Sequence, residues 1–210
     1  DDLGAGALVS LERFGLSHEP RMQDSIAAGA DVVLSSTDKL IGASQGGVIL
    51  GGAAHIQAIR KHPLARALRV DKTCLMALER TLYLFRDEER LIREHPLYRM
   101  LAAPPATLRR RAEKLAEQIA AAAPCMRAET REGVGFLGSG SLPMEKLQTW
   151  LVAVTTRDRK ASELARRLRL DEACVFTRIE DDAVVLDVRT LRDAELAPIA
   201  AAMNRICQGS

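Results

Sequence analysis

The sequence has 210 residues, of which 47% are hydrophobic and 28% are charged, and its formal net charge is only +2. This composition is typical of a globular protein, and it argues against a disordered chain, a collagen-like chain and a disulfide-rich miniprotein. The balanced charge argues against whole-chain attraction to nucleic acid or to an anionic membrane, and no apolar run approaches the about 20 residues that a membrane helix needs.

The four cysteines lie far apart in the sequence, at Cys74, Cys125, Cys174 and Cys207. This spacing lacks the close pairs of a zinc knuckle or a redox dithiol, so no metal is expected. We expect four buried free thiols in the reducing cytoplasm. The chain opens on two aspartates without Met or a signal peptide, and we expect it to be a fragment.

The first half of the chain predicts two β-strands followed by long helices. The strands are expected at 31–34 and 46–52, and the connection between them is too short for a crossover helix, so they should pair antiparallel. An amphipathic helix is predicted from residue 71 onward. After a break between residues 95 and 105, a second helix carries an apolar stripe, while its arginines at 109–111 are expected to face solvent.

The second half predicts shorter elements that together form a small α+β lobe. These are strands at 126–130 and 150–155, a helix at 162–168, a hairpin of strands at 175–179 and 184–188, and a closing helix from about residue 197. The hairpin carries an acidic turn at 180–182, and a loop rich in glycine and serine is expected at 138–143.

Lys39 directly follows the first predicted strand and is surrounded by small residues and glycines. Partial burial of such an amine lowers its pKa and favours Schiff-base chemistry, although this position alone fits a structural or exposed lysine better. A pyridoxal phosphate enzyme also needs an acid beside the pyridinium nitrogen, and Asp2 is the candidate. Ser36, three residues before Lys39, supplies a hydroxyl that can reach a cofactor phosphate.

Arg66 and Arg69 form a second candidate site. Two guanidiniums on one helical turn point the same way and can clamp a tetrahedral oxyanion through charge-assisted bonds. The competing interpretation is the exposed end of a surface helix.

Four segments together resemble one known family. They are residues 2–8 (DLGAGAL), residues 38–51 (DKLIG to QGGVILG), residues 62–72 (HPL to RALRVDK) and residues 140–143 (GSLP). In this order they resemble bacterial L-seryl-tRNA(Sec) selenium transferase over essentially the whole chain. The resemblance implies an α/β fold, namely the C-terminal part of a fold-type I pyridoxal phosphate (PLP)-dependent transferase. Residues 1–72 would end the PLP-binding large domain, residues 73–95 would form a linking helix and residues 96–210 a small α+β domain.

The resemblance also implies roles for individual residues. Lys39 would hold pyridoxal 5'-phosphate, Asp38 would take part in catalysis and Asp2 would pair with the pyridinium. Arg66 and Arg69 would line the pocket for selenophosphate. The implied reaction converts seryl-tRNA(Sec) to selenocysteinyl-tRNA(Sec) through a dehydroalanyl intermediate. It would take place in the cytoplasm, in a homo-oligomeric ring of dimers.

The chain departs from the family in its length and in the Lys39 loop. Family members are longer, and the missing N-terminal half would hold the tRNA-binding domain and most of the cofactor phosphate loop, so the isolated chain is expected to be inactive. Thr37 and Ala43–Ser44 stand where family members commonly carry Gly and Gly-Pro. The loop can therefore differ in shape from that of the family, and the activity can be lower.

Two alternative functions remain open. Another fold-type I enzyme, such as a sugar-acid ammonia lyase, would keep Lys39 and Asp2 but need not keep both Arg66 and Arg69. A non-catalytic remnant would act as an interaction module.

Overall fold

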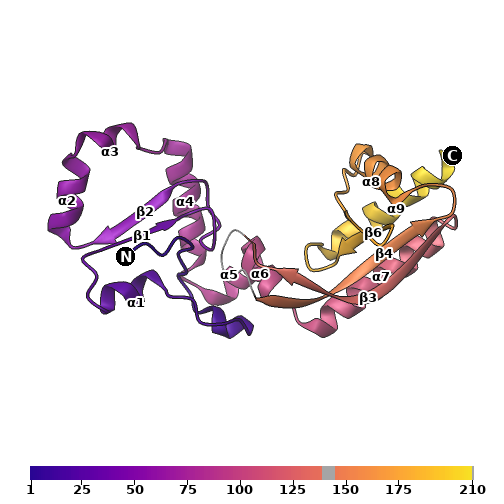
Figure 1. Ribbon diagram of the computed structural model, residues 1–210, viewed down its shortest axis with the longest axis horizontal. Helices are drawn as coiled ribbons and strands as arrows, with labels where there is room; N and C mark the ends of the chain where they lie inside the picture. Colours follow the sequence, from indigo (N-terminus) through magenta and orange to yellow (C-terminus); the bar gives the residue numbers. More distant parts are fainter. Residues whose placement is uncertain (139–144, 210) are drawn as a thin grey trace. The chain divides into compact units, whose positions relative to one another are not determined.

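The computed structural model describes residues 1–138 and 145–209, so residues 139–143 of the expected loop lie outside the described part. The chain divides into two compact units (Figure 1). Unit 1 comprises Asp1–Ala102 and Phe136–Glu145, and unit 2 comprises Ala103–Gly135 and Lys146–Ser210. Among the helices of the described residues, none has the length and apolar character that crossing a bilayer requires.

Unit 1 is built on an antiparallel pair of strands, β1 (Val32–Ser36) and β2 (Gly47–Gly51). This pair confirms both the predicted strands and their direction. The N-terminal segment runs parallel to β1, because the N–H of Leu3 donates to the carbonyl of Leu34 (3.1 Å) and the N–H of Leu34 donates to the carbonyl of Asp1 (2.9 Å). The first residues of the chain therefore lie beside the strand that leads to Lys39.

Short helices account for most of the rest of unit 1. In chain order they are η1 (Leu11–Phe14), α1 (Met22–Ala27), α2 (Ala53–Lys61), α3 (Pro63–Ala67), α4 (Lys72–Leu84), α5 (Glu88–Glu94) and α6 (Pro96–Leu101). The single helix expected over residues 73–95 is thus two helices. The break arises because the Asp87 carboxylate caps a new helix by accepting the N–H of Arg90 (3.1 Å).

The division between the units also differs from the boundary expected at residue 96. Helix α6 belongs to unit 1, because Tyr98 and Leu101 are buried in its core. Helix α4, in contrast, has no buried residue. Its side chains Leu75 and Met76 are 50% and 68% exposed, and they line an open apolar groove of about 670 Å³. Unit 1 therefore combines a small core with a large exposed apolar surface.

Unit 2 contains a four-stranded sheet in the order β3-β4-β6-β5. Its strands are β3 (Met126–Phe136), β4 (Lys146–Thr156), β5 (Arg178–Glu180) and β6 (Ala183–Asp187), and β6 is antiparallel to both β4 and β5. The predicted hairpin is present with a shorter first strand. Asp181 and Asp182 form its turn with φ of +49° and +57°, the left-handed conformation that a tight two-residue hairpin turn requires.

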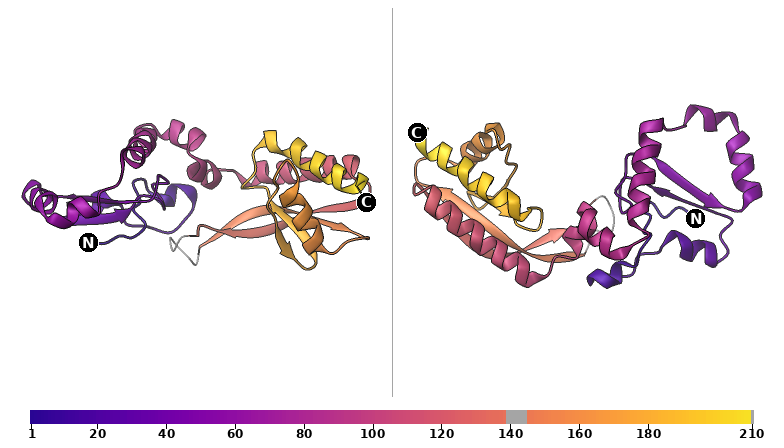
Figure 2. Two further views of the ribbon diagram at one scale, coloured as in Figure 1. Left: turned by 90° about the horizontal axis from the view of Figure 1, so that it is seen from above. Right: turned by 180° about the vertical axis from the view of Figure 1, so that it is seen from behind.

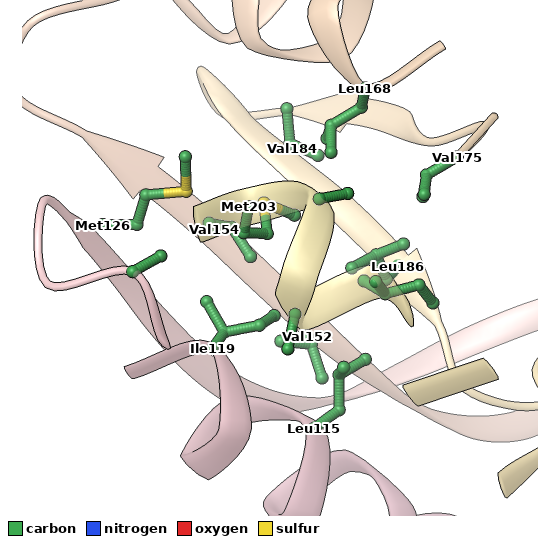
Figure 3. Close-up of a cluster of buried hydrophobic side chains, with 14 of the residues drawn as sticks. Leu115, Ile119, Met126, Val152, Val154, Leu168, Val175, Val184, Leu186 and Met203 are labelled. Atoms are coloured by element: carbon green, nitrogen blue, oxygen red, sulfur yellow. The ribbon is translucent and has the colours of Figure 1, made fainter. Parts of the chain in front are cut away.

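The helices of unit 2 cover its sheet and complete a hydrophobic core. They are α7 (Pro105–Ala122), α8 (Ala161–Leu170), η2 (Asp193–Glu195) and α9 (Leu196–Gln208), and α7 and α9 lie side by side in Figure 2. The predicted stripe of α7, which consists of Leu108, Ala112, Leu115 and Ile119, is fully buried. Figure 3 shows Leu115 and Ile119 packed with Val152, Leu186 and Met203.

One of the arginines expected on the solvent face of α7 is not solvated. The side chain of Arg111 is only 15% exposed. Its guanidinium donates to Asp193 (2.7 Å) and to the carbonyl of Val188 (3.1 Å), so it ties α7 to the segment that follows β6.

The expectation of four free buried thiols is wrong. Cys125 and Cys207 form a disulfide with a Cα–Cα distance of 6.0 Å, whereas Cys74 is a half-buried free thiol and Cys174 an exposed one. The pairing follows from core packing, because the neighbours Met126 and Ile206 belong to one hydrophobic cluster. The start of β3 and the end of α9 therefore meet.

A thiol count tests this pairing. Protein purified without reductant and unfolded in denaturant should show two reactive thiols, and four after reduction. The disulfide closes a loop with a sequence separation of 82 residues, so Cys125→Ser should lower the free energy of unfolding of unit 2 by about 2–4 kcal/mol in oxidised protein. Cys174→Ser is the matched control and should change it little. Four reactive thiols before reduction would contradict the pairing.

Candidate functional site

Lys39 lies in the bend after β1, against the N-terminal segment of the chain. The N–H of Ser36 donates to the carbonyl of Gly4 (3.2 Å), and the N–H of Leu40 donates to the carbonyl of Ala5 (3.3 Å). The Lys39 Nζ lies 4.0 Å from the point that a Cβ on Gly4 would occupy, and Gly4 has a φ of +59°. A glycine is thus suited to this position by its backbone, and it leaves the space beside the amine open.

The structure brings Asp2 and Ser36 to the same place as Lys39. The Asp2 carboxylate accepts the N–H of Gly4 (3.0 Å), so it lies next to the glycine that the Lys39 amine approaches. Ser36 ends β1 and is bonded through its backbone to Gly4. An amine, a carboxylate and a hydroxyl-bearing residue therefore surround one glycine.

Thr37 closes the loop that carries Lys39. It is buried, its N–H donates to the carbonyl of Gly46 (3.0 Å), and its hydroxyl donates to the carbonyl of Ser44 (2.7 Å). The Ser44 hydroxyl in turn donates to the carbonyl of Cys74 in α4 (3.1 Å). Thr37 and Ser44, two of the departures from the resembled family, are therefore hydrogen-bonded to each other within one loop.

Two buried side chains that the sequence analysis did not single out contact this loop from the junction of α5 and α6. The Tyr98 hydroxyl donates to the carbonyl of Leu40 (2.9 Å), and His95 Nε2 donates to the carbonyl of Ile41 (3.0 Å). A carbonyl only accepts, so Nε2 carries the proton. The sequence marks His95 and Pro96 only as a helix break, and no local signal there points to Lys39.

Burial changes the protonation of both side chains. It lowers the pKa of His95 and raises the pKa of Tyr98, because the charged forms lose hydration. The folded chain thus favours neutral His95. Since unfolding lets this imidazole take up a proton, His95 makes unit 1 less stable as the pH falls below the ordinary histidine pKa of about 6.5.

A small cavity lies beside Lys39 and has a volume of about 280 Å³. Its lining includes Asp38, Lys39, Gly42, His95, Pro96 and Met100. Asp38 is exposed and Lys39 half-buried. Ligand cavities usually measure about 300–1,000 Å³, so this one accommodates only part of a cofactor and its substrate. Residues 1–138 and 145–209 contain no group of three acidic, His or Cys side chains arranged to hold a metal.

Arg66 and Arg69 lie outside this cavity. Arg66 belongs to α3, Arg69 follows that helix, and both are exposed. Neither guanidinium forms an ion pair with a carboxylate in the described part of the chain. The following residue, Val70, is close to the Lys39 loop, because a Cβ on Gly46 would lie 3.4 Å from its side chain. Arg69 is therefore the sequence neighbour of a residue that lies at the loop, and no hydrogen bond joins either arginine to Lys39 within the described residues.

Two polar residues of the same segment serve as helix caps. His62 Nδ1 accepts the N–H of Leu64 at the start of α3 (3.2 Å), and the Asp71 carboxylate accepts the N–H of Cys74 at the start of α4 (2.8 Å). The hydrogen bonds to this carboxylate lower the pKa of Asp71. These caps fix where α3 and α4 begin, on either side of Arg66 and Arg69.

Comparison with a solved structure identifies the fold. The structure of D-glucosaminate-6-phosphate ammonia-lyase matches 99% of this chain and 48% of its own chain, with a TM-score of 0.57 and 21% identity. This likeness concerns the fold alone. It confirms the expected α/β class.

Comparison of sequences identifies the family. Residues 1–192 match the family model for L-seryl-tRNA selenium transferase. The L-seryl-tRNA(Sec) selenium transferases of Alkaliphilus oremlandii and Geobacter metallireducens are 36% and 41% identical over 208 and 206 residues. The matches cover 99% and 98% of this chain but only 44% and 45% of the relatives, so the chain spans less than half their length. The chain belongs to the L-seryl-tRNA selenium transferase family.

Proposed function

We propose that this chain is the C-terminal part of a PLP-dependent enzyme that converts seryl-tRNA(Sec) to selenocysteinyl-tRNA(Sec) with selenophosphate. The observation that carries the proposal is the position of the Lys39 amine beside Gly4, whose N–H binds the Asp2 carboxylate, within the segment that matches the family model. The likeness to an ammonia-lyase does not favour that second function, because at 21% identity it concerns the fold only.

The residues around Gly4 fit pyridoxal 5'-phosphate in their chemistry. Lys39 would hold the cofactor through its Nζ, the Asp2 carboxylate would pair with the ring nitrogen, and the Ser36 hydroxyl would bind the phosphate. A side chain at Gly4 would enter the space beside the Lys39 amine, and its absence leaves room for a ring. When bound, the cofactor supplies an electron sink for the bond changes at the substrate's α-carbon.

The remaining roles follow from exposure and charge. Asp38 and Lys39 line one cavity, and in this proposal their carboxylate and amine hold or pass on a proton there. Arg66 and Arg69 are exposed and form no ion pair within the described residues, so their guanidiniums are available for the phosphate group of selenophosphate.

The proposed enzyme needs more than this chain. The relatives are more than twice as long, and the part that lies outside the match would supply most tRNA contacts and further donors for the cofactor phosphate. In this proposal unit 1 belongs to the cofactor-binding domain and unit 2 is the small domain. The exposed apolar residues of α4 support association with further protein, including other copies in a ring of dimers. We place the reaction in the cytoplasm.

Chemical trapping tests the role of Lys39. In the full-length protein, borohydride should fix the cofactor on Lys39, as read from peptide masses, and Lys39→Arg should abolish the absorption band of the bound cofactor. Lys61→Arg and Lys72→Arg are controls that should leave the band unchanged, since both lysines are exposed on or beside helices outside the cavity. Cofactor fixed on Lys61 or Lys72 would contradict the assignment, and full-length protein that takes up no cofactor would favour the non-catalytic alternative.

Substitution of the two arginines tests the binding of selenophosphate. A charge-assisted hydrogen bond is worth about 1.5–3 kcal/mol, so Arg66→Ala or Arg69→Ala should reduce the use of selenophosphate roughly ten- to a hundredfold. The cofactor content should stay that of the wild type. Arg60→Ala, which removes an exposed arginine from the end of α2, is the matched control. Loss of the cofactor, or unchanged selenium transfer, would show that the arginines have another role.

A further inference from the structure

The two carbonyl groups that follow Lys39 in the chain are held by side chains from a distant segment. Tyr98 and His95 are 0% and 3% exposed, and they donate to the carbonyls of Leu40 and Ile41 across sequence separations of 58 and 54 residues. The two rings pack edge to face at 5.0 Å between their centroids. This arrangement is a buried clamp on the backbone, and we call it the His95–Tyr98 clamp.

The clamp fits the backbone closely at Gly42. This glycine has a φ of +67°, and a Cβ there would lie only 2.5 Å from the His95 ring. Leu40 and Ile41 are each 1% exposed, so water does not replace a lost donor at their carbonyls. A buried carbonyl without a partner is unfavourable, and the clamp therefore restricts residues 40–42 to one conformation.

Lys39 lies between two anchored points of the loop. On one side, Thr37 bonds to Gly46 and Ser44. On the other side, Leu40 is held through its N–H by Ala5 and through its carbonyl by Tyr98. Only Asp38 and Lys39 lie between these points, so the direction of the Lys39 side chain toward Gly4 depends on both anchors.

We propose that His95 and Tyr98 are positioning residues that direct the Lys39 amine toward the cofactor site. This inference rests on the proposed function of Lys39. Tyr98 does not line the cavity beside Lys39, and His95, which does, also donates to the backbone that follows Lys39. Both side chains therefore act on Lys39 through this backbone. If the two side chains only stabilised the packing of α6 on the loop, their loss would leave the binding of the cofactor to Lys39 unchanged.

The test compares the two tyrosines of the chain in the full-length protein. Tyr98→Phe removes the hydroxyl and keeps the ring, and Tyr83→Phe, on the exposed face of α4, is the matched control. Amide hydrogen exchange of residues 38–42 in cofactor-free protein should become about tenfold faster in Tyr98→Phe, as expected for one lost buried hydrogen bond. The cofactor concentration at half saturation of Lys39, read by borohydride trapping, should rise about tenfold as well. Tyr83→Phe should change neither quantity more than twofold.

A second pair of variants separates positioning from general stability. His95→Gln keeps an N–H that can donate to Ile41, whereas His95→Leu does not. His95→Gln should therefore preserve more trapping at Lys39 and more of the wild-type absorption band than His95→Leu, at a temperature where circular dichroism shows both folded. If only one variant folds, the comparison of Tyr98→Phe with Tyr83→Phe decides.

The outcomes distinguish this inference from the function on which it rests. Wild-type trapping at Lys39 together with unchanged half saturation in Tyr98→Phe would overturn the positioning role alone, even if exchange became faster. Failure of the wild type to trap the cofactor at Lys39 would instead contradict the proposed function and, with it, the inference.

Discussion

The pairing of the N-terminal segment with β1 is the constraint on which the candidate site depends. The first residues lie parallel to the strand, because backbone hydrogen bonds join Leu3 to Leu34 and Gly4 to Ser36. Because a strand rises about 3.3 Å per residue, a shift of one residue would move Asp2 and Gly4 away from the bend that carries Lys39. It would also reverse which side chains face that bend. The register of this short pairing thus sets the distance between carboxylate and amine.

The same bend is stabilised from within and from outside. Thr37 and Ser44 close it internally, and the Ser44 hydroxyl connects it to the first turn of α4. The His95–Tyr98 clamp closes it from the other side, supported by the ring of Phe85, which packs on Tyr98 at 5.4 Å. Several elements thus restrain the loop on both sides of the exposed Asp38 and the half-buried Lys39, which belong to no helix or strand.

Local patterns predicted the elements whose stability is local in origin. The paired strands, the buried stripe of α7 and the acidic turn at Asp181–Asp182 follow from alternation, helical periodicity and turn chemistry. The features that were missed depend on contacts between distant residues. These contacts are the disulfide between Cys125 and Cys207 and the hydrogen bonds from Tyr98 and His95. Each joins residues more than fifty positions apart, and no local pattern in the sequence predicts them. The helix break at Asp87 was not predicted, because the apolar repeat of the preceding amphipathic helix continues almost up to this residue.

The two units differ in how completely they bury their apolar side chains, and this difference bears on the site. Unit 2 encloses a continuous core drawn from α7, α8, α9 and its strands. Unit 1 leaves Ile49, Leu50, Leu75 and Met76 at least 40% exposed. Apolar surface of this kind is stabilised by association, and it lies in the unit that carries Lys39. Association would therefore bury surface on the unit that holds the candidate site, whereas unit 2 already has a core of its own.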